Sequence, residues 1–182
     1  FGTVALADRI VERMASSTFD DAHRAFIEGV SMFFLATADS EGRPDCSYKG
    51  GLPGFVRVLD SSTLAFPHYD GNGMFKSLGN MLANPSVGLL FIDFETPRRL
   101  RVNGVASIDR ADPLLGSFPG AQLLVRVAPT AVFLNCPRYV HTMAVSEHSV
   151  YAPRNDYTPP EPEWKQRPEF SDVVPTSPCN SE

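Results

Sequence analysis

Short apolar segments separated by turn residues recur along most of the chain, and this pattern restricts the fold more than any other feature. Each segment is rich in aliphatic, β-branched or aromatic residues, which is typical of buried strands. The strand-like segments are residues 31–38, 45–49, 55–59, 62–67, 86–94, 98–109 and 122–134. We expect the last of them to be broken by Pro129. Many short strands with few helices predict a mainly β fold, either a sandwich or a small barrel.

Two short segments have helical character. Residues 19–29 carry apolar side chains at helical spacing, with Asp20 near the start and Gly29 at the end. Residues 74–83 have helical composition, and Pro85 follows them closely. Proline disfavours a helical backbone in the residue before it, so the second helix should end by residue 83.

The composition changes after residue 150. Residues 151–182 hold seven of the chain's 16 prolines, a density that excludes regular helices and strands. The same residues hold the only tryptophan, Trp164. We therefore expect residues 1–150 to form one domain and residues 151–182 to form an extended arm. The arm either wraps over its own core or a partner subunit, or it stays loose.

Charge and cysteine content limit the partners and the compartment. The 182 residues include 16 basic and 21 acidic ones, a formal net charge of −5, which argues against binding to nucleic acid or to an anionic membrane. No run approaches the roughly 20 apolar residues that cross a bilayer, and we find no secretion signal. Cys46, Cys136 and Cys179 are far apart, which favours a reducing cytoplasm over a disulfide framework.

Common signatures of metal, nucleotide and hydrolase sites are missing from the sequence. The four histidines form no HxH or HxxxH pair, so we expect no metal site. We find no GxxxxGK[ST] motif and no GxGxxG motif between a strand and a helix. No serine has the sequence context of a nucleophile elbow.

Three arginines crowd one predicted strand of this acidic chain. Strand alternation places Arg99 and Arg101 on one face and Arg98 on the other. Their anionic partner is either a neighbouring carboxylate or a ligand phosphate. The candidate carboxylates are Asp93, Glu95 and Asp109.

A second group of phosphate-binding side chains surrounds the start of the helix at residues 74–83. Ser47 and Lys49 end an earlier strand, and Lys76, Ser77 and Asn80 lie in the helix. The first turn of a helix offers unpaired N–H groups and a partial positive charge, both of which favour a phosphate. Taken together with the arginines, these residues indicate a phosphate-bearing ligand.

Residues 26–108 resemble the flavin-binding split β-barrel of the pyridoxamine 5′-phosphate oxidase-like family. The resemblance rests on the order and spacing of short motifs at residues 33–38, 42–44, 64–66, 83–85, 88–91 and 99–104. Residues 46–55 and 135–139 resemble a branch distinct from the true oxidases. The true oxidases have an Arg-x-Val-Leu-Leu-Lys strand where this chain has Ser47-Tyr48-Lys49-Gly50-Gly51.

The resemblance implies a Greek-key split β-barrel that forms a homodimer and binds FMN at the subunit interface. The family's flavin-contacting glutamine falls on Arg99, and we expect Arg138 on the substrate side. The other cofactor contacts implied are Ser47, Tyr48, Lys49, Phe66, Lys76, Ser77, Asn80 and Arg101.

The expected function is that of an FMN-dependent oxidoreductase acting on a small molecule, because no general acid or base stands out and a flavin carries its own redox chemistry. One alternative keeps the fold and exchanges the cofactor for F420 or for haem, which would need an axial ligand such as a histidine. Another alternative is a non-enzymatic flavin-binding sensor or storage dimer whose proline-rich arm recruits a partner.

Overall fold

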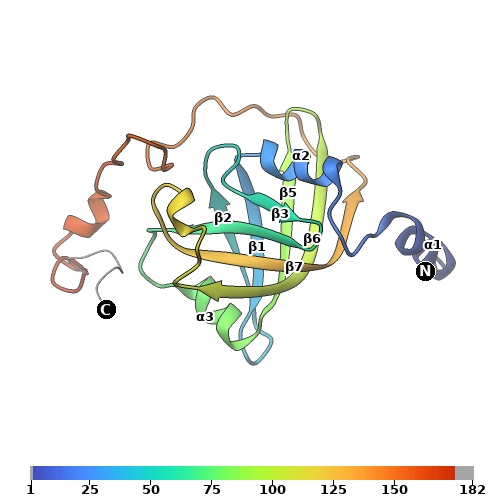
Figure 1. The fold of residues 1–182 in the computed structure, drawn as a ribbon, viewed down its shortest axis with the longest axis horizontal. Coiled ribbons are helices and arrows are strands. Elements are labelled where there is room, and N and C mark those ends of the chain that lie inside the picture. The colour runs from blue at the N-terminus through green and yellow to red at the C-terminus, as the bar shows by residue number, and fades with distance from the viewer. Residues whose placement is uncertain (1, 175–182) are drawn as a thin grey trace.

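Seven antiparallel strands form one curled sheet in the computed structural model, which describes residues 2–174 (Figure 1). The strand order is β2-β1-β5-β6-β7-β4-β3, and among the described residues the edge strands β2 and β3 do not pair with each other. The strands are β1 (Met32–Ala38), β2 (Pro44–Gly50), β3 (Arg57–Asp60), β4 (Thr63–Tyr69), β5 (Ser86–Asp93), β6 (Arg98–Asp109) and β7 (Ala121–Asn135). The expected mainly β, split-barrel fold is confirmed.

One face of the sheet carries the core. In β1, Phe33 and Leu35 are fully buried, whereas Phe34 points to the other face and is half-buried. The ring of Phe33 lies 5.1 Å from the rings of both Phe66 and Phe91. Truncating such a buried aromatic to alanine costs about 3–5 kcal/mol, so this aromatic cluster contributes strongly to the stability of the barrel.

Two helices lie at opposite ends of the sheet in Figure 1. Helix α2 (Asp21–Gly29) contacts β3, and helix α3 (Lys76–Ala83) contacts β1 and β6. Helix α2 begins with a capping box, in which Asp20 Oδ1 accepts a hydrogen bond from the His23 backbone N–H at 2.7 Å. Both helices agree with the sequence-based prediction to within two residues.

Helix α1 (Val4–Met14) precedes the first element that the sequence predicted. None of its residues is buried, and the helix stands apart from the sheet (Figure 1). Ser16 ties the following segment to β7 through two backbone hydrogen bonds with Val132. No helix within residues 2–174 is both long and apolar enough to cross a membrane.

The expected break of the last strand at Pro129 is wrong. Strand β7 continues through this residue, and its register with β6 shifts, so that Asn103 faces Ala131 while Gly104 faces Pro129. Proline has no N–H to donate and is therefore accommodated where the ladder is interrupted by a bulge. Gly104 is needed there, because a Cβ would lie 2.5 Å from the backbone oxygen of Ala128.

The chain after β7 runs along the outside of the sheet (Figure 1). The Met143 N–H donates to the backbone oxygen of Phe94 at 3.0 Å, and Lys165 pairs with Asp70. Short 3₁₀ helices occur at η1 (Leu115–Ser117) and η2 (Glu163–Gln166). Cys179 and the rest of residues 175–182 lie outside the described residues, and the division of the chain at residue 150 stays a prediction.

Candidate functional site

A cavity of about 410 Å³ lies between the edge strand β2, the end of β4 and the loop that leads into α3. Four residues that the sequence assigned to phosphate binding line it together, namely Ser47, Lys49, Lys76 and Ser77. The cavity therefore brings together residues that are distant in the sequence, such as Ser47 and Ser77, which are 30 positions apart. The other lining residues are Asp45, Cys46, Tyr48, Gly50, Phe55, Pro67, His68, Tyr69, Asp70, Gly71, Asn72, Gly73, Met74 and Phe75.

The alternation of side chains along β2 directs Ser47 and Lys49 to one face of the sheet, and a side-chain contact brings Ser77 to Ser47. Ser47 and Lys49 face the same side of the sheet as their cross-strand neighbours on β1, Leu35 and Phe33, which belong to the core. Of the two, Ser47 contacts the first turn of α3, and Lys49 lines the same cavity. Ser47 Oγ lies 3.0 Å from the Oγ of Ser77, which is almost fully buried.

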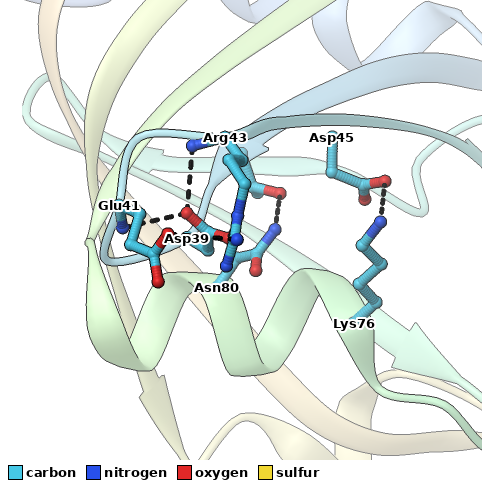
Figure 2. A network of polar contacts seen from close by, with 7 residues as sticks. Asp39, Glu41, Arg43, Asp45, Lys76 and Asn80 are labelled. Atoms are coloured by element: carbon cyan, nitrogen blue, oxygen red, sulfur yellow. Dashed lines mark hydrogen bonds and ion pairs between the residues drawn. The ribbon is translucent and has the colours of Figure 1, made fainter.

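The carboxylates of the cavity each have a lysine partner. Lys76 reaches from the first turn of α3 to Asp45 on β2, with Nζ 3.0 Å from Oδ1 (Figure 2). Asp70, in the loop after β4, pairs with Lys165 of the arm. Among residues 2–174, no carboxylate lies within 4 Å of Lys49.

Lys49 is therefore the cation of the cavity without a close counter-charge. Burial lowers the pKa of its ammonium group, and the charge of Asp45 opposes this only in part. An anion bound beside Lys49 would favour the charged form again.

The first turn of α3 also faces the cavity through Lys76 and Ser77. Its N-cap residue, Phe75, provides no side-chain hydrogen bond to the N–H groups of this turn. Uncapped N–H groups at a helix start form hydrogen bonds with anions. The helix start, the two serine hydroxyls and Lys49 thus form a set of donors suited to a phosphate.

His68 is a cavity residue that the sequence reasoning missed. Burial and the neighbouring Lys49 charge lower the pKa of His68 to about 4, against a smaller opposing effect of Asp70. Its ring lies 5.1 Å from that of Phe75, with the two planes 33° apart. At neutral pH the cavity wall therefore carries an uncharged pair of aromatic rings. A lone histidine with no patterned partner gives no sequence signal for such a position.

Three other predicted site residues lie elsewhere. Phe66 is buried in the core. Asn80 is also buried, and its Nδ2 donates a hydrogen bond to Thr37 Oγ1 at 3.0 Å (Figure 2). Arg138 is exposed in the segment after β7. None of the three lines the cavity, and their roles stay predictions.

The opposite face of the sheet carries a row of mostly apolar side chains that crosses five strands. We call it the outer row, and it consists of Tyr48, Phe34, Leu90, Arg101 and Phe133, each opposite the next in strand register. The Tyr48 and Phe34 rings pack edge to face with centroids 6.2 Å apart, and Arg101 lies over the Phe133 ring at 5.6 Å. Tyr48 is 63% exposed and also lines the cavity, so the outer row begins beside it.

The arginine cluster divides as the alternation predicted. Arg98 pairs with Asp93 at 3.1 Å, so a carboxylate is its partner. Arg99 and Arg101 lie on the face of the outer row, and no ion pair within residues 2–174 involves either of them. Arg99 Nε is buried without a hydrogen-bond partner among the described residues. Because Lys49 faces the other side of the sheet, one chain alone does not bring Arg99 and Lys49 together.

Comparisons with known proteins identify the fold. HupZ from Group A Streptococcus matches with a TM-score of 0.51 at 16% identity, over 69% of this chain and 99% of that chain. A putative pyridoxamine 5′-phosphate oxidase from Lactobacillus delbrueckii matches with a TM-score of 0.50 at 22% identity, over 65% of this chain and 95% of that chain. At such identities the likeness concerns the fold alone. A search of curated protein sequences gave no significant match.

The sequence itself carries the family relationship. The pyridoxamine 5′-phosphate oxidase family matches residues 19–136, more than half of the chain. These residues run from just before α2 to just after β7 and include both the cavity-lining residues of β2, β4 and α3 and the whole outer row. The chain therefore belongs to the pyridoxamine 5′-phosphate oxidase family.

Proposed function

We propose that this protein binds FMN and acts as a flavin-dependent oxidoreductase on a small molecule, with the FMN phosphate in the cavity beside Lys49. The observation that carries the proposal is the convergence of Ser47, Lys49 and Ser77 with the uncapped start of α3. Each feature alone is common on protein surfaces. Their combination in one cavity matches the needs of a phosphate, which requires a cation and several directed donors.

The donor set fits a phosphate ester better than a carboxylate. Two hydroxyls, one ammonium group and the helix N–H groups approach from β2 and from α3, and a phosphate has three terminal oxygens to accept from both sides. The carboxylates Asp45 and Asp70 are already paired with lysines, so their repulsion of an anion is reduced.

We also propose that the protein acts as a homodimer, with a second copy packed across the outer row. Phe34, Leu90 and Phe133 offer an apolar surface there, and the exposed Tyr48 connects that surface to the cavity. A second copy could then supply Arg99 and Arg101 from its own outer face, which one chain cannot do. Within residues 2–174 neither arginine forms an ion pair, so neither has a carboxylate partner that would compete with a bound ligand.

Bound FMN would supply electron or hydride transfer, while the residues of this chain bind and orient it. Two titratable side chains lie at the end of β4, Tyr69 and His68, and both are uncharged near neutral pH. Burial raises the pKa of Tyr69 to about 12 and lowers that of His68 to about 4. Arg99 would place a permanent cation near the flavin ring, where it favours negative charge.

The cytoplasmic location belongs to the proposal and is supported by the exposed free thiols of Cys46 and Cys136.

The absorption spectrum of the purified protein, recorded as isolated and after FMN is added, tests the cofactor. We expect flavin bands that stay with the protein through gel filtration. Bands of a deazaflavin or of haem would replace FMN by one of the two alternative cofactors, and the absence of any retained chromophore after FMN addition would contradict the proposal.

The enzyme is tested separately from the cofactor. FMN-loaded protein should oxidise NADH or NADPH, or pass electrons to a small-molecule acceptor. The same assays on a variant without residues 151–182 show whether the arm is needed for this activity. The protein would be a binding protein instead if it retains FMN, reduces neither the FMN nor an acceptor, and needs the arm to capture a partner.

A further inference from the structure

Phe75 has a backbone conformation that aromatic residues rarely adopt. Its φ is 51° and its ψ is 25°, in the left-handed region, and within residues 2–174 Asp156 is the only other non-glycine residue with positive φ. In this region the Cβ crowds the following carbonyl oxygen, so residues other than glycine, asparagine and aspartate are strained. Such strain persists where the surrounding structure holds it in place, and it clusters at ligand sites.

The neighbouring sequence makes a phenylalanine at this position more notable. Gly73, two residues earlier, also has a positive φ, and Asn72 uses its side chain to accept a hydrogen bond from the Met74 N–H at 3.1 Å. The loop thus contains the residue types that suit a left-handed turn, yet a bulky aromatic occupies the strained position directly before α3.

Burial of the ring in the core does not explain the strain. The Phe75 side chain is 37% exposed and is not a member of the core, whereas the ring of Phe33 is completely buried. Its aromatic contact is His68, which is half-buried, and both side chains line the cavity. The ring of Phe75 therefore stands at the cavity surface, directly beside the donor set of Lys76 and Ser77.

We propose that Phe75 is a ligand-contact residue, and that its ring, backed by His68, forms an aromatic wall for the planar ring of a phosphate ester. The same left-handed residue leaves the first N–H groups of α3 without a side-chain cap and so available to the phosphate. The ligand class that follows is an aromatic group joined to a phosphate, in preference to inorganic phosphate or a sugar phosphate. This inference rests on the proposed phosphate site but does not require the ligand to be FMN.

Binding of phenyl phosphate and of inorganic phosphate to the flavin-free protein, measured by calorimetry, tests the wall. Phe75→Leu keeps apolar bulk and removes the ring, and Phe75→Tyr keeps the ring. Stacking on an aromatic side chain should make wild-type protein bind phenyl phosphate about tenfold more tightly than inorganic phosphate. Phe75→Tyr should retain this preference, and Phe75→Leu should lose it while its affinity for inorganic phosphate stays the same.

The strain is tested by thermal unfolding of two further variants that both lack the ring. Glycine tolerates positive φ and alanine does not, so Phe75→Gly should unfold about 2–4 °C higher than Phe75→Ala. A Phe75→Gly variant that unfolds at the same temperature as Phe75→Ala, or below it, would show that the backbone at this position is not strained.

The outcomes separate this inference from the proposed function. Phe75 is not a ligand contact, even where FMN binds, if wild-type protein binds phenyl phosphate no more tightly than inorganic phosphate. The same holds if Phe75→Leu still binds phenyl phosphate more tightly than inorganic phosphate. If wild-type protein prefers phenyl phosphate through Phe75 but does not retain FMN, the aromatic wall stands and the cofactor assignment fails.

Discussion

The hydroxyl oxygens of Ser47 and Ser77 lie 3.0 Å apart and join the edge strand β2 to the first turn of α3. Together with the ion pair between Lys76 and Asp45, this contact holds the helix against the edge of the sheet. It also places Lys49, two residues further along β2, at the same cavity as the start of the helix. The proposed phosphate site depends on this junction.

Replacing Ser77 by alanine should weaken FMN binding about tenfold. A hydrogen bond to a charged group contributes about 1.5–3 kcal/mol, and part of it can be taken over by the Ser47 hydroxyl. Quenching of flavin fluorescence measures the affinity. Ser107→Ala, at an exposed position of β6 away from the cavity, is the matched control and should bind FMN like the wild type. Equal affinities for all three proteins would remove Ser77 from the site.

Lys49→Met should raise the melting temperature of the flavin-free protein by roughly 2 °C. Burial disfavours the charged form of Lys49 and lowers its pKa, so the empty cavity holds a cation at a cost in stability. Lys76→Met is the control, because Lys76 is exposed and paired with Asp45 and should not stabilise the protein when removed. Differential scanning fluorimetry of both variants gives the comparison. A lower melting temperature for Lys49→Met would mean that Lys49 is a structural residue.

The strands could be predicted from the sequence because their signals are local. Alternation in β6 and the turn residues between the other strands located each element to within a few residues, and the same alternation correctly separated Arg98 from Arg99 and Arg101. Helix α1 was missed although Ile10, Val11 and Met14 have helical spacing, and none of its residues is buried. The bulge at Pro129 could not be predicted, because it depends on how closely β6 approaches β7 and the sequence of either strand alone does not show this distance.

The site could be predicted only in part, because it depends on which elements the fold brings together. Four residues could be selected from the sequence because the chemistry of each is visible in its own segment. The structure places all four at one cavity, namely Ser47, Lys49, Lys76 and Ser77. The position of Arg99 on the face opposite Lys49 follows from strand pairing across the sheet. His68 and Phe75 gave no pattern at all, since their importance arises from one ring contact and one backbone angle.

His68 should make the protein less stable in mild acid. Its pKa is about 4 in the folded protein, below the ordinary 6.5, so between these pH values the unfolded chain binds a proton that the folded protein does not. The stability that neutral His68 contributes is present above pH 6.5 and is lost as the pH falls toward 4. Because the ring is partly exposed, the loss should be roughly 1–2 kcal/mol, less than the full shift implies.

Urea unfolding at pH 7 and pH 4.5 measures this effect. The gap in unfolding free energy between the two pH values should be smaller in His68→Gln than in the wild type. His141→Gln, at an exposed position outside the cavity, should show the wild-type gap. An unchanged gap in His68→Gln would show that His68 titrates alike in the folded and unfolded states.

Leu90→Glu should convert the protein into a monomer if the outer row is the interface between two copies. Leu90 lies in the middle of the row, where a carboxylate would face the apolar side chains of the second copy without a partner. Leu82→Glu makes the same chemical change on α3, where Leu82 is 76% exposed and outside the row, and should leave the dimer intact. Light scattering after gel filtration gives the mass. A monomeric wild type, or a Leu90→Glu variant that stays dimeric, would contradict the proposed interface.

The affinities of FMN and riboflavin for wild-type protein and for Lys49→Met show whether the FMN phosphate lies beside Lys49, because the two flavins differ only in the phosphate. We predict that the wild type binds FMN about 100-fold more tightly than riboflavin, as expected when a phosphate gains charge-assisted hydrogen bonds worth about 3 kcal/mol. In Lys49→Met the preference should fall to about tenfold or less, while riboflavin affinity stays unchanged. Equal affinities for the two flavins in the wild type, or a preference that Lys49→Met leaves intact, would show that the phosphate is not bound beside Lys49.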